Sequence, residues 1–482
     1  MRVRCLRQGD WHCAALLAIF ILSVHTPLHA QGGTAGGLSL SAQGPYTAGV
    51  MRGTATSEVL QLSLTDAIGR GLKNNLGGIL SEQGQRGSQA ARIRALAELL
   101  PTLSVRALAS EQQINLAAFG FSNFPGIAPI VGPFGLVDLR AYLSQRLLDF
   151  HAIRGVQASR ESLGAAQNDV QDARDTVVLA VGALYLQTLA GESRVDAARA
   201  QVQTAQAVYD QSADLKKSGV IPAIDLLRAE VQFEAERQRL LSAENDFEKM
   251  KLGLEQAIGL PLAQRIALTD KLSPESLPQV PFDQVLSNAF ENRADYRALQ
   301  ARVRAAEFAR RAAAAERYPT VSAAVDYGTI GQSPAQNHGT MTAGLAINVP
   351  VFDGRRTEAS VLQADAELRM RSAQRDALRG RIEYEIRTVF LDLKSALDQV
   401  TMARHALDLA DAQVTQAQDR FKAGVSGSLE VVQAQQAHAT ASDNYIASLF
   451  AYNLAKGMLA RSAGQAEKFF GAYVLGMKAA VQ

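Results

Sequence analysis

The chain has 482 residues, and its 49 basic and 47 acidic side chains nearly cancel, which argues against a nucleic-acid partner. Both cysteines, Cys5 and Cys13, lie within residues 1–30, so the rest of the chain has no disulfide, thiolate nucleophile or cysteine metal site. The length is sufficient for two or three ordinary domains.

Residues 1–30 have the pattern of a secretory signal peptide. Three arginines precede a short apolar run, 14–24, and a small residue, Ala30, precedes the expected cleavage site. The apolar run is too short to span a bilayer as a helix. We therefore expect an exported chain that begins at Gln31. It should carry no N-terminal lipid, because no cysteine follows the cleavage site, and no later apolar run reaches membrane-helix length.

The remainder of the chain repeats one pattern. An offset of about 205 residues aligns KKSGVIPAIDLLRA, at 216–229, with FKAGVSGSLEVVQA, at 421–434. Similar offsets align further signals on either side of these phrases. The expected boundaries are a flexible leader over 31–61, repeat 1 over 62–260, a proline-rich connector over 261–281, repeat 2 over 282–465 and a C-terminal tail over 466–482.

Each repeat predicts a moderate helix and a hairpin of two long helices. Between Pro133 and Pro261 the only proline is Pro222, and none follows Pro350, so long uninterrupted helices are allowed. Apolar residues recur at alternating three- and four-residue steps, the pattern of a coiled coil. The predicted helices are 64–99, 152–215 and 223–258 in repeat 1, and 283–317, 354–421 and 428–462 in repeat 2. The longest would reach roughly 90–100 Å, and such hairpins need lateral neighbours.

Between the first and second helix of each repeat, the apolar period changes to two. Four strands are predicted, at 101–114, 135–149, 319–329 and 341–352. One face is apolar, and the other carries polar residues that include Arg106, Asp138, Arg140 and Asp326. This alternation fits a membrane barrel with these four side chains in a wet lumen, although a soluble sheet is the alternative. Four strands cannot close around a wet lumen, so several chains would be needed.

This ordered, duplicated set of elements resembles the TolC-like outer-membrane efflux protein family. The resemblance covers about 60–465 and is carried by LSLTDAIGRGLKNN (62–75), the LLP and RYP before the odd strands, NVPVFDGRR (348–356) with its weaker partner RLLDFHAIRG (146–155), and the two Gly-Val turns. Membership implies a mainly helical homotrimer with a small β part. Twelve strands would form one barrel in the cell outer membrane. Twelve helices would continue it as a periplasmic tube, with a collar midway along the tube built partly from the chain ends and the connector.

The resemblance also implies roles for residues of the two turns, as hairpin tips near 216–224 and 421–428. A periplasmic adaptor would dock at Gly219, Val220, Ile221, Gly424, Val425 and Ser426. The channel aperture would be formed by Asp225, Phe421, Ser426 and Glu430.

Two acids of the tips are the informative side chains. Glu430 matches an acid that faces the aperture in the family, so three copies would form an anionic ring. Asp225 matches an acid that the family holds with a tyrosine, but here the matching position is Phe421, and the usual nearby arginine is Ser426. Either acid could also act simply as favourable charge at a helix N-terminus.

The function implied by the resemblance is the exit duct of a tripartite efflux or type I secretion system. Its partners would be a periplasmic adaptor and an inner-membrane pump. No cofactor and no catalytic residue are expected, and no metal site, because the histidines share no ligand spacing. Two alternatives remain. A periplasmic adaptor or scaffold would need only one hairpin, and an exported hydrolase would need a catalytic cluster or phosphate loop that the sequence does not display.

Overall fold

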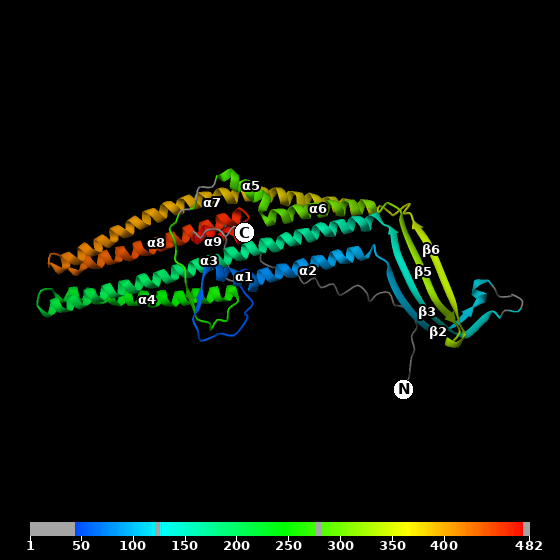
Figure 1. The fold of residues 1–482 in the computed structure, drawn as a ribbon, viewed down its shortest axis with the longest axis horizontal. Helices are drawn as coiled ribbons and strands as arrows, with labels where there is room; N and C mark the ends of the chain where they lie inside the picture. The colour runs from blue at the N-terminus through cyan, green and yellow to red at the C-terminus, as the bar shows by residue number, and fades with distance from the viewer. Residues whose placement is uncertain (1–43, 121–125, 127, 276, 278–280, 476–482) are drawn as a thin grey trace, which may run out of the picture. The chain divides into compact units, whose positions relative to one another are not determined.

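The computed structural model describes residues 44–120, 126, 128–275, 277 and 281–475. The predicted signal peptide and the first part of the leader lie outside these ranges. One order of elements, a helix, two strands and two long helices, occurs twice in the described chain. Figure 1 shows the four main strands at one end of the long helices and the hairpin turns at the other.

Four long helices make up most of the fold. In the first half, α3 (Phe150–Lys217) is followed by α4 (Ala223–Ile258). In the second half, α7 (Arg356–Lys422) is followed by α8 (Ser428–Ser462). Each pair packs side by side as an antiparallel hairpin, and α3 also packs against α8. At 1.5 Å per residue, the 68 residues of α3 extend over roughly 100 Å.

An aspartate fixes the start of both longest helices. Asp149 is the N-cap of α3, and its Oδ1 accepts a hydrogen bond of 2.9 Å from the Ala152 amide. Asp353 lies two residues before Arg355, the N-cap of α7, and its Oδ2 accepts from the Thr357 amide at 2.9 Å. These bonds satisfy amides that would otherwise lack a partner at the helix N-terminus. Each aspartate therefore marks the change from strand to helix.

The two helices predicted over 64–99 and 283–317 are each broken, which the sequence analysis did not predict. The first consists of α1 (Leu64–Asn74) and α2 (Leu76–Ala97), and the second of α5 (Phe282–Asn292) and α6 (Ala294–Ala315). The residue at each break, Asn75 or Arg293, has extended backbone. Each is buried and finds polar partners there: Asn75 bonds the Tyr46 carbonyl, and Arg293 pairs with Asp295 and Glu385. Tertiary contacts thus override helix propensity at both sites.

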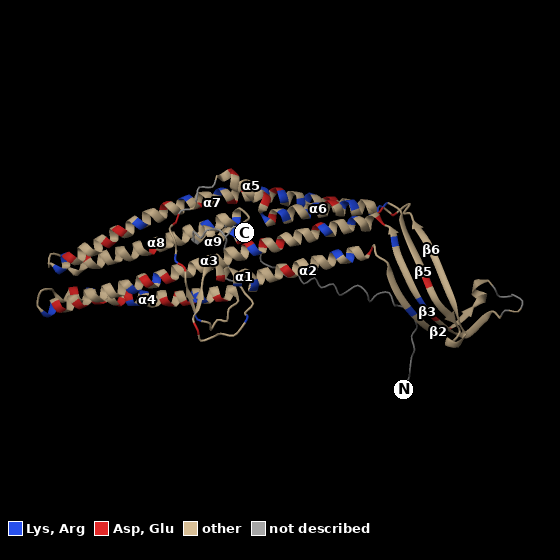
Figure 2. Ribbon diagram, in the orientation of Figure 1, with Lys and Arg blue, Asp and Glu red and all other residues tan. Residues whose placement is uncertain are grey.

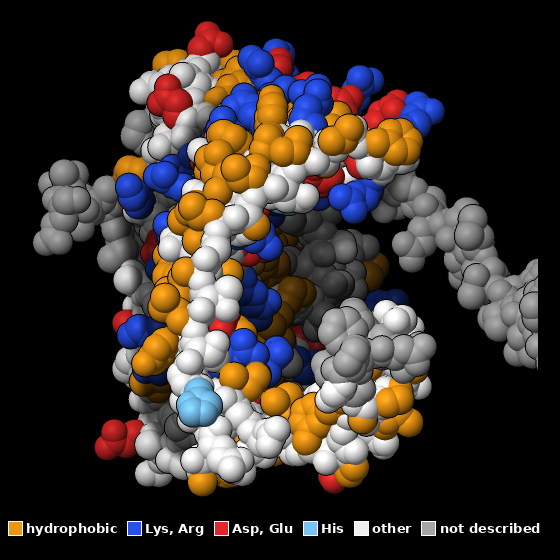
Figure 3. Space-filling model, turned by 90° about the vertical axis from the view of Figure 1, so that its right-hand side faces the viewer, with side chains coloured by type: hydrophobic (Ala, Val, Ile, Leu, Met, Phe, Trp, Pro, Cys, Tyr) orange, Lys and Arg blue, Asp and Glu red, His pale blue; other side chains and the backbone are white. Residues whose placement is uncertain are grey.

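A four-stranded antiparallel sheet contains β2 (Thr102–Asn115), β3 (Ile130–Leu148), β5 (Thr320–Gly331) and β6 (Asn337–Asn348), in that order. The register places apolar side chains of all four strands on one face. Large ones that are exposed there are Leu103, Val105, Leu139, Leu143, Val325, Tyr327, Met341, Leu345 and Ile347. Figure 2 shows few charged residues on the strands and many along the helices, and Figure 3, viewed from the strand end, shows hydrophobic side chains at the surface.

The main core lies midway along the helices, where segments from the whole chain meet. Leader and connector form a two-stranded parallel sheet, β1 (Leu60–Leu62) with β4 (Ile266–Leu268). The Tyr185 hydroxyl donates to Asp270 at 2.7 Å, fastening the connector to α3. Residues 44–59, assigned to the leader from the sequence, make backbone hydrogen bonds to this region, for example from the Val50 amide to the Asn74 carbonyl. The described parts of the leader and the connector therefore belong to the folded unit.

The predicted tail contains a helix, α9 (Ala466–Leu475), which packs against α8 and α3. The buried ring of Phe470 lies against Gly182 and Gly457, where an added Cβ would come within 2.4 Å of the ring. The sequence analysis expected no later apolar run of membrane-helix length, but among the described residues one helix, α3, has a stretch that is apolar enough to cross a membrane. Of that stretch, 72% is buried in the fold. The core at this level explains its apolar composition.

Candidate functional site: hairpin tips and charged sheet face

The two hairpin tips have the same backbone geometry. In each, a glycine with positive φ ends the helix, 77° at Gly219 and 69° at Gly424. The following valine amide bonds a carbonyl five residues back: Val220 to Leu215 at 2.9 Å and Val425 to Arg420 at 3.0 Å. This pattern is a Schellman motif, which glycine favours because it has no Cβ. The Gly-Val repetition in the sequence thus encodes one turn used twice.

Apolar side chains are exposed at these turns. Val220 is 61% exposed and Val425 is 68% exposed, while Ile221 is partly buried. The valine in such a motif often packs back on its own helix, but here both point into solvent. The tips therefore expose apolar side chains on turns with a defined pattern of backbone hydrogen bonds.

At the tips, the two hairpins are joined by one buried hydrogen bond. Asp225 in the first turn of α4 is 8% exposed, and its Oδ1 accepts from the Ser428 hydroxyl at 2.9 Å. Arg228, one turn further along α4, donates to the same oxygen at 3.3 Å. Ser428 is the first residue of α8 and is fully buried. The sequence analysis did not identify Ser428 as the partner of Asp225; it noted only that Phe421, at the position of the family's tyrosine, has no hydroxyl to offer.

Phe421 has a packing role in the structure. It is 2% exposed and lies in an apolar cluster contributed by all four long helices. We call this set the tip cluster; its buried members are Val208, Ala229, Ala417, Phe421, Val431 and Ala434. The Ser426 hydroxyl is buried and has no hydrogen-bond partner among the described residues. Of the predicted aperture residues, the structure thus brings Asp225 and Phe421 to the contact between the hairpins.

Glu430 lies in the first turn of α8 and is half exposed. Its Oε1 is 3.2 Å from Nε of Arg420, near the end of α7. This pair spans the turn of one hairpin, whereas Asp225 and Ser428 connect two hairpins. Both acids also sit at helix N-termini, so the simple electrostatic role and a role at an aperture are compatible.

Charged residues predicted for the barrel lumen occupy one face of the sheet. Arg106 lies opposite Arg140 in the register, and Asp326 lies opposite Tyr142. Arg140 donates from Nε to Asp138 at 2.7 Å and from Nη1 to Asp326 at 3.2 Å, connecting β3 with β5. Arg106 stacks over the Tyr142 ring at 5.4 Å. The polar face is therefore an ordered network of charges.

Among the residues described, no group of three or more His, Asp or Glu side chains could hold a metal ion. The apolar loop between β2 and β3 has a short 3-10 helix, η1 (Leu116–Phe119), and residues 121–125 and 127 lie outside the described part. The surfaces described so far are the two tips, the charged sheet face and the apolar sheet face.

Comparison with known proteins agrees with this architecture. The family model described as "Outer membrane efflux protein" matches residues 82–260 and 285–465. Pyoverdine export outer membrane protein OpmQ of Pseudomonas putida is 26% identical over 304 residues, which are 60% of this chain and 63% of that protein. Outer membrane efflux protein BepC of Brucella suis is 25% identical over 308 residues, 61% of this chain and 64% of that protein. The chain thus spans less than two thirds of the length of either relative.

Solved structures share the fold. The outer-membrane channel OprN has a TM-score of 0.70 at 20% identity, with 83% of this chain and 90% of that chain covered. VceC of Vibrio cholerae also has a TM-score of 0.70, at 18% identity, with 83% of this chain and 96% of that chain covered. Two matches to the family model together cover most of the sequence. The chain therefore belongs to the outer membrane efflux protein family and is an outer-membrane protein.

Proposed function

We propose that this protein is the outer-membrane channel of a tripartite efflux or type I secretion system, a passive exit duct that performs no chemistry. The observation that carries the proposal is the sheet with an exposed apolar face and a charged opposite face. An apolar face of this size in water would be unfavourable, whereas lipid accommodates it. The long helical hairpins of the same chain supply a path through the periplasm.

The assembly that fits these surfaces is a homotrimer. Four strands cannot enclose a wet lumen, whereas three copies supply twelve. The long helices also have exposed apolar side chains that a neighbouring copy would cover, including Leu227, Val231 and Leu241 on α4 and Leu362, Leu391 and Leu409 on α7. In this assembly Arg106, Asp138, Arg140 and Asp326 line the lumen of the barrel.

The domain organisation is a tandem duplication, with repeats near 62–260 and 282–465 and a collar built from leader, connector and α9. Two separate matches to one family model support it, as does the repeated element order. A periplasmic adaptor or scaffold, the alternative raised in the sequence analysis, would need only one hairpin and not two such halves.

The hairpin tips form the periplasmic gate and the docking site for the adaptor, which an inner-membrane pump accompanies. Val220 and Val425 supply the apolar contact. The Asp225–Ser428 hydrogen bond and the tip cluster keep the two hairpins together at rest, and three copies of Glu430 form an anionic ring. Adaptor binding at the tips opens the duct by separating the hairpins.

The test is single-channel conductance of detergent-purified protein in a planar bilayer, with Glu430→Gln beside the wild type. Cation-preferring steps are expected, and the variant should lose much of the preference because its ring is neutral. Asp419→Asn, which removes an exposed acid one turn before the tip, is the matched control. If the Glu430→Gln channel keeps the conductance and cation preference of the wild type, the constriction does not lie at Glu430. Protein that stays soluble without detergent and never conducts would refute the channel.

A further inference from the structure

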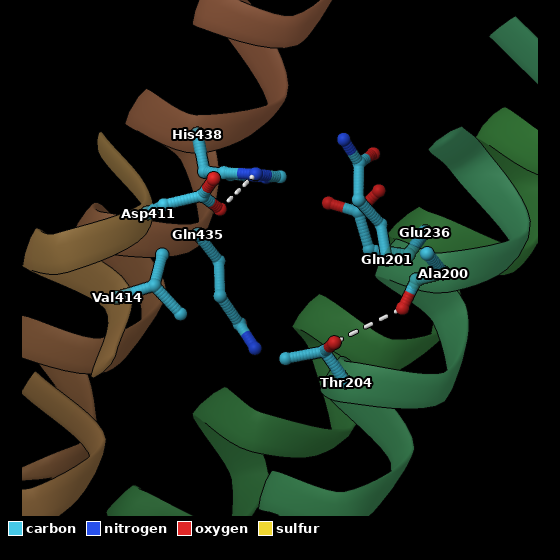
Figure 4. Close-up of a pocket in the computed structure, with 8 residues that line it drawn as sticks. All are labelled: Ala200, Gln201, Thr204, Glu236, Asp411, Val414, Gln435 and His438. Atoms are coloured by element: carbon cyan, nitrogen blue, oxygen red, sulfur yellow. Dashed lines mark hydrogen bonds and ion pairs between the residues drawn. The ribbon is translucent and has the colours of Figure 1, made fainter. Parts of the chain in front are cut away.

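A small polar cavity lies between the two hairpins, on the collar side of the tip cluster. Its volume is about 120 Å³, and all four long helices line it. Its lining residues are Ala200, Gln201, Thr204, Glu236, Asp411, Val414, Gln435 and His438. Figure 4 shows the side chains of α7 and α8 facing those of α3 and α4 across this space.

Gln435 is the unusual side chain of the cavity. It is 8% exposed, and neither its amide oxygen nor its amide nitrogen has a hydrogen-bond partner among the described residues. Figure 4 shows the amide extending from α8 into the cavity. Burial of an unpartnered amide is unfavourable, so a polar occupant that pairs with at least the amide oxygen is favoured.

The charges of the cavity favour a cation over an anion. Glu236, from α4, is 3% exposed and accepts from Gln232 at 2.7 Å and from Arg239 at 3.0 Å. Burial raises the pKa of this carboxyl group above its usual value. Asp411, on the opposite hairpin, lies 2.9 Å from Nε2 of His438. The two carboxylates outnumber the one guanidinium paired with them, that of Arg239, which does not line the cavity, so the cavity disfavours an anion.

We propose that this cavity binds one small cation per chain, either an inorganic ion or a primary alkylammonium, through side-chain oxygens that include those of Gln435, Gln201 and Glu236. A volume of about 120 Å³ suits a small cation. Carboxamide and carboxylate oxygens are ligands for hard ions such as Mg²⁺ and Ca²⁺, and they also accept hydrogen bonds from an ammonium group.

Because both hairpins contribute ligands, the bound cation stabilises the arrangement in which they lie together. A ligand that binds one conformation shifts the equilibrium toward it in proportion to its differential affinity. Val414 lines the cavity and also packs against the tip cluster, so the two regions are contiguous. Binding itself does not depend on the proposed channel activity, so either proposal can fail alone.

The experiment is isothermal titration calorimetry of the detergent-purified chain with MgCl₂, CaCl₂ or methylammonium chloride, in choline chloride at constant ionic strength. All proteins carry Glu430→Gln, so that a ring of acids at the tip does not contribute. Saturable binding of one cation per chain is expected. Gln435→Leu should weaken it at least tenfold, by loss of a ligand, whereas Gln436→Leu, which changes an exposed neighbour, should leave it unchanged.

Binding by the metal ions alone identifies an inorganic ligand, and binding by methylammonium alone identifies an amine. If Gln435→Leu does not fold, Thr204→Val replaces it. Thr440→Val is the control, because both hydroxyls donate to the carbonyl four residues back and only Thr204 lines the cavity. The proposal is overturned if none of the three salts shows saturable binding, or if the cavity and control variants bind equally. Water would then be the occupant of the cavity.

Discussion

Two serines near the second hairpin tip differ in the environment of their hydroxyl groups. Ser428 donates to the buried carboxylate of Asp225, whereas the buried hydroxyl of Ser426 has no partner among the residues described. A hydrogen bond to a charged group contributes about 1.5–3 kcal/mol. Of these two serines, Ser428 therefore connects the hairpins and Ser426 does not.

Ser428→Ala should favour the open tip. Loss of the bond leaves Asp225 with Arg228 alone and should raise the resting open probability roughly 10- to 100-fold, since about 1.4 kcal/mol is a factor of ten. Single-channel recording without adaptor measures this. Ser426→Ala is the control and should behave as wild type. Equal opening in both variants would mean that the Asp225 contact does not hold the tip.

Gly328 is a second position where adding a single atom, a Cβ, is expected to disturb the structure. A Cβ there would lie 2.0 Å from the Leu139 carbonyl oxygen and 2.6 Å from Cα of Arg140, on the neighbouring strand. Gly328→Ala should therefore disrupt β3–β5 pairing, at a cost of about 1–3 kcal/mol or more. Gly344→Ala, at an open site on β6, should be tolerated. The yield of folded protein, measured as heat-modifiable migration on a gel, distinguishes Gly328→Ala from Gly344→Ala. Equal yields of the two variants would contradict the close approach of Gly328 to β3.

At the scale of the elements, the C-terminal end of α4 buries a carboxyl group whose charged form is unfavourable there. Glu255 is 4% exposed, its Oε2 has no partner among the described residues, and it lies at the negative end of the helix dipole. Burial raises its pKa from 4.5 to about 7. The folded state therefore holds more protons than the unfolded state between these two pH values, and stability falls as the pH rises through them.

Glu255→Gln should remove this contribution to the pH dependence. The variant should unfold at a higher temperature than wild type above about pH 7 and show a smaller difference near pH 4.5, because the neutral amide replaces a buried charge. Thermal unfolding in detergent across this range measures the effect. Glu230→Gln, an exposed position on the same helix, should retain the wild-type slope. A slope unchanged in Glu255→Gln would assign the titration to another group.

For the whole molecule, the two faces of the sheet decide how the chain meets a bilayer. Leu345 is 72% exposed on the apolar face, and Thr342 lies on the opposite face of the same strand. In the proposed barrel, a lysine at position 345 would enter lipid, at about 2–4 kcal/mol per copy near the bilayer centre. Leu345→Lys should reduce assembly in outer-membrane fractions, whereas Thr342→Lys should assemble. Equal assembly of both would contradict a lipid-facing apolar surface.

Much of the architecture could be predicted because it depends on short-range patterns. Proline placement and the apolar period located α4 (Ala223–Ile258) and α8 (Ser428–Ser462), and the change to a period of two located the strands. The Gly-Val phrases predicted two equivalent turns, since positive φ is favourable for glycine. The breaks at Asn75 and Arg293 were missed, because burial and distant partners cause them.

The sequence by itself therefore determined the types and order of the elements, the tip turns and the faces of the strands, all of which follow from backbone geometry within a few residues. Only the tertiary structure decided the contacts between distant segments. Asp225 and Ser428 are 203 residues apart, and Tyr185 and Asp270 are 85 apart. The cavity around Gln435 requires four helices in one register. No local pattern encodes such pairings, because they arise from how the helices pack against each other.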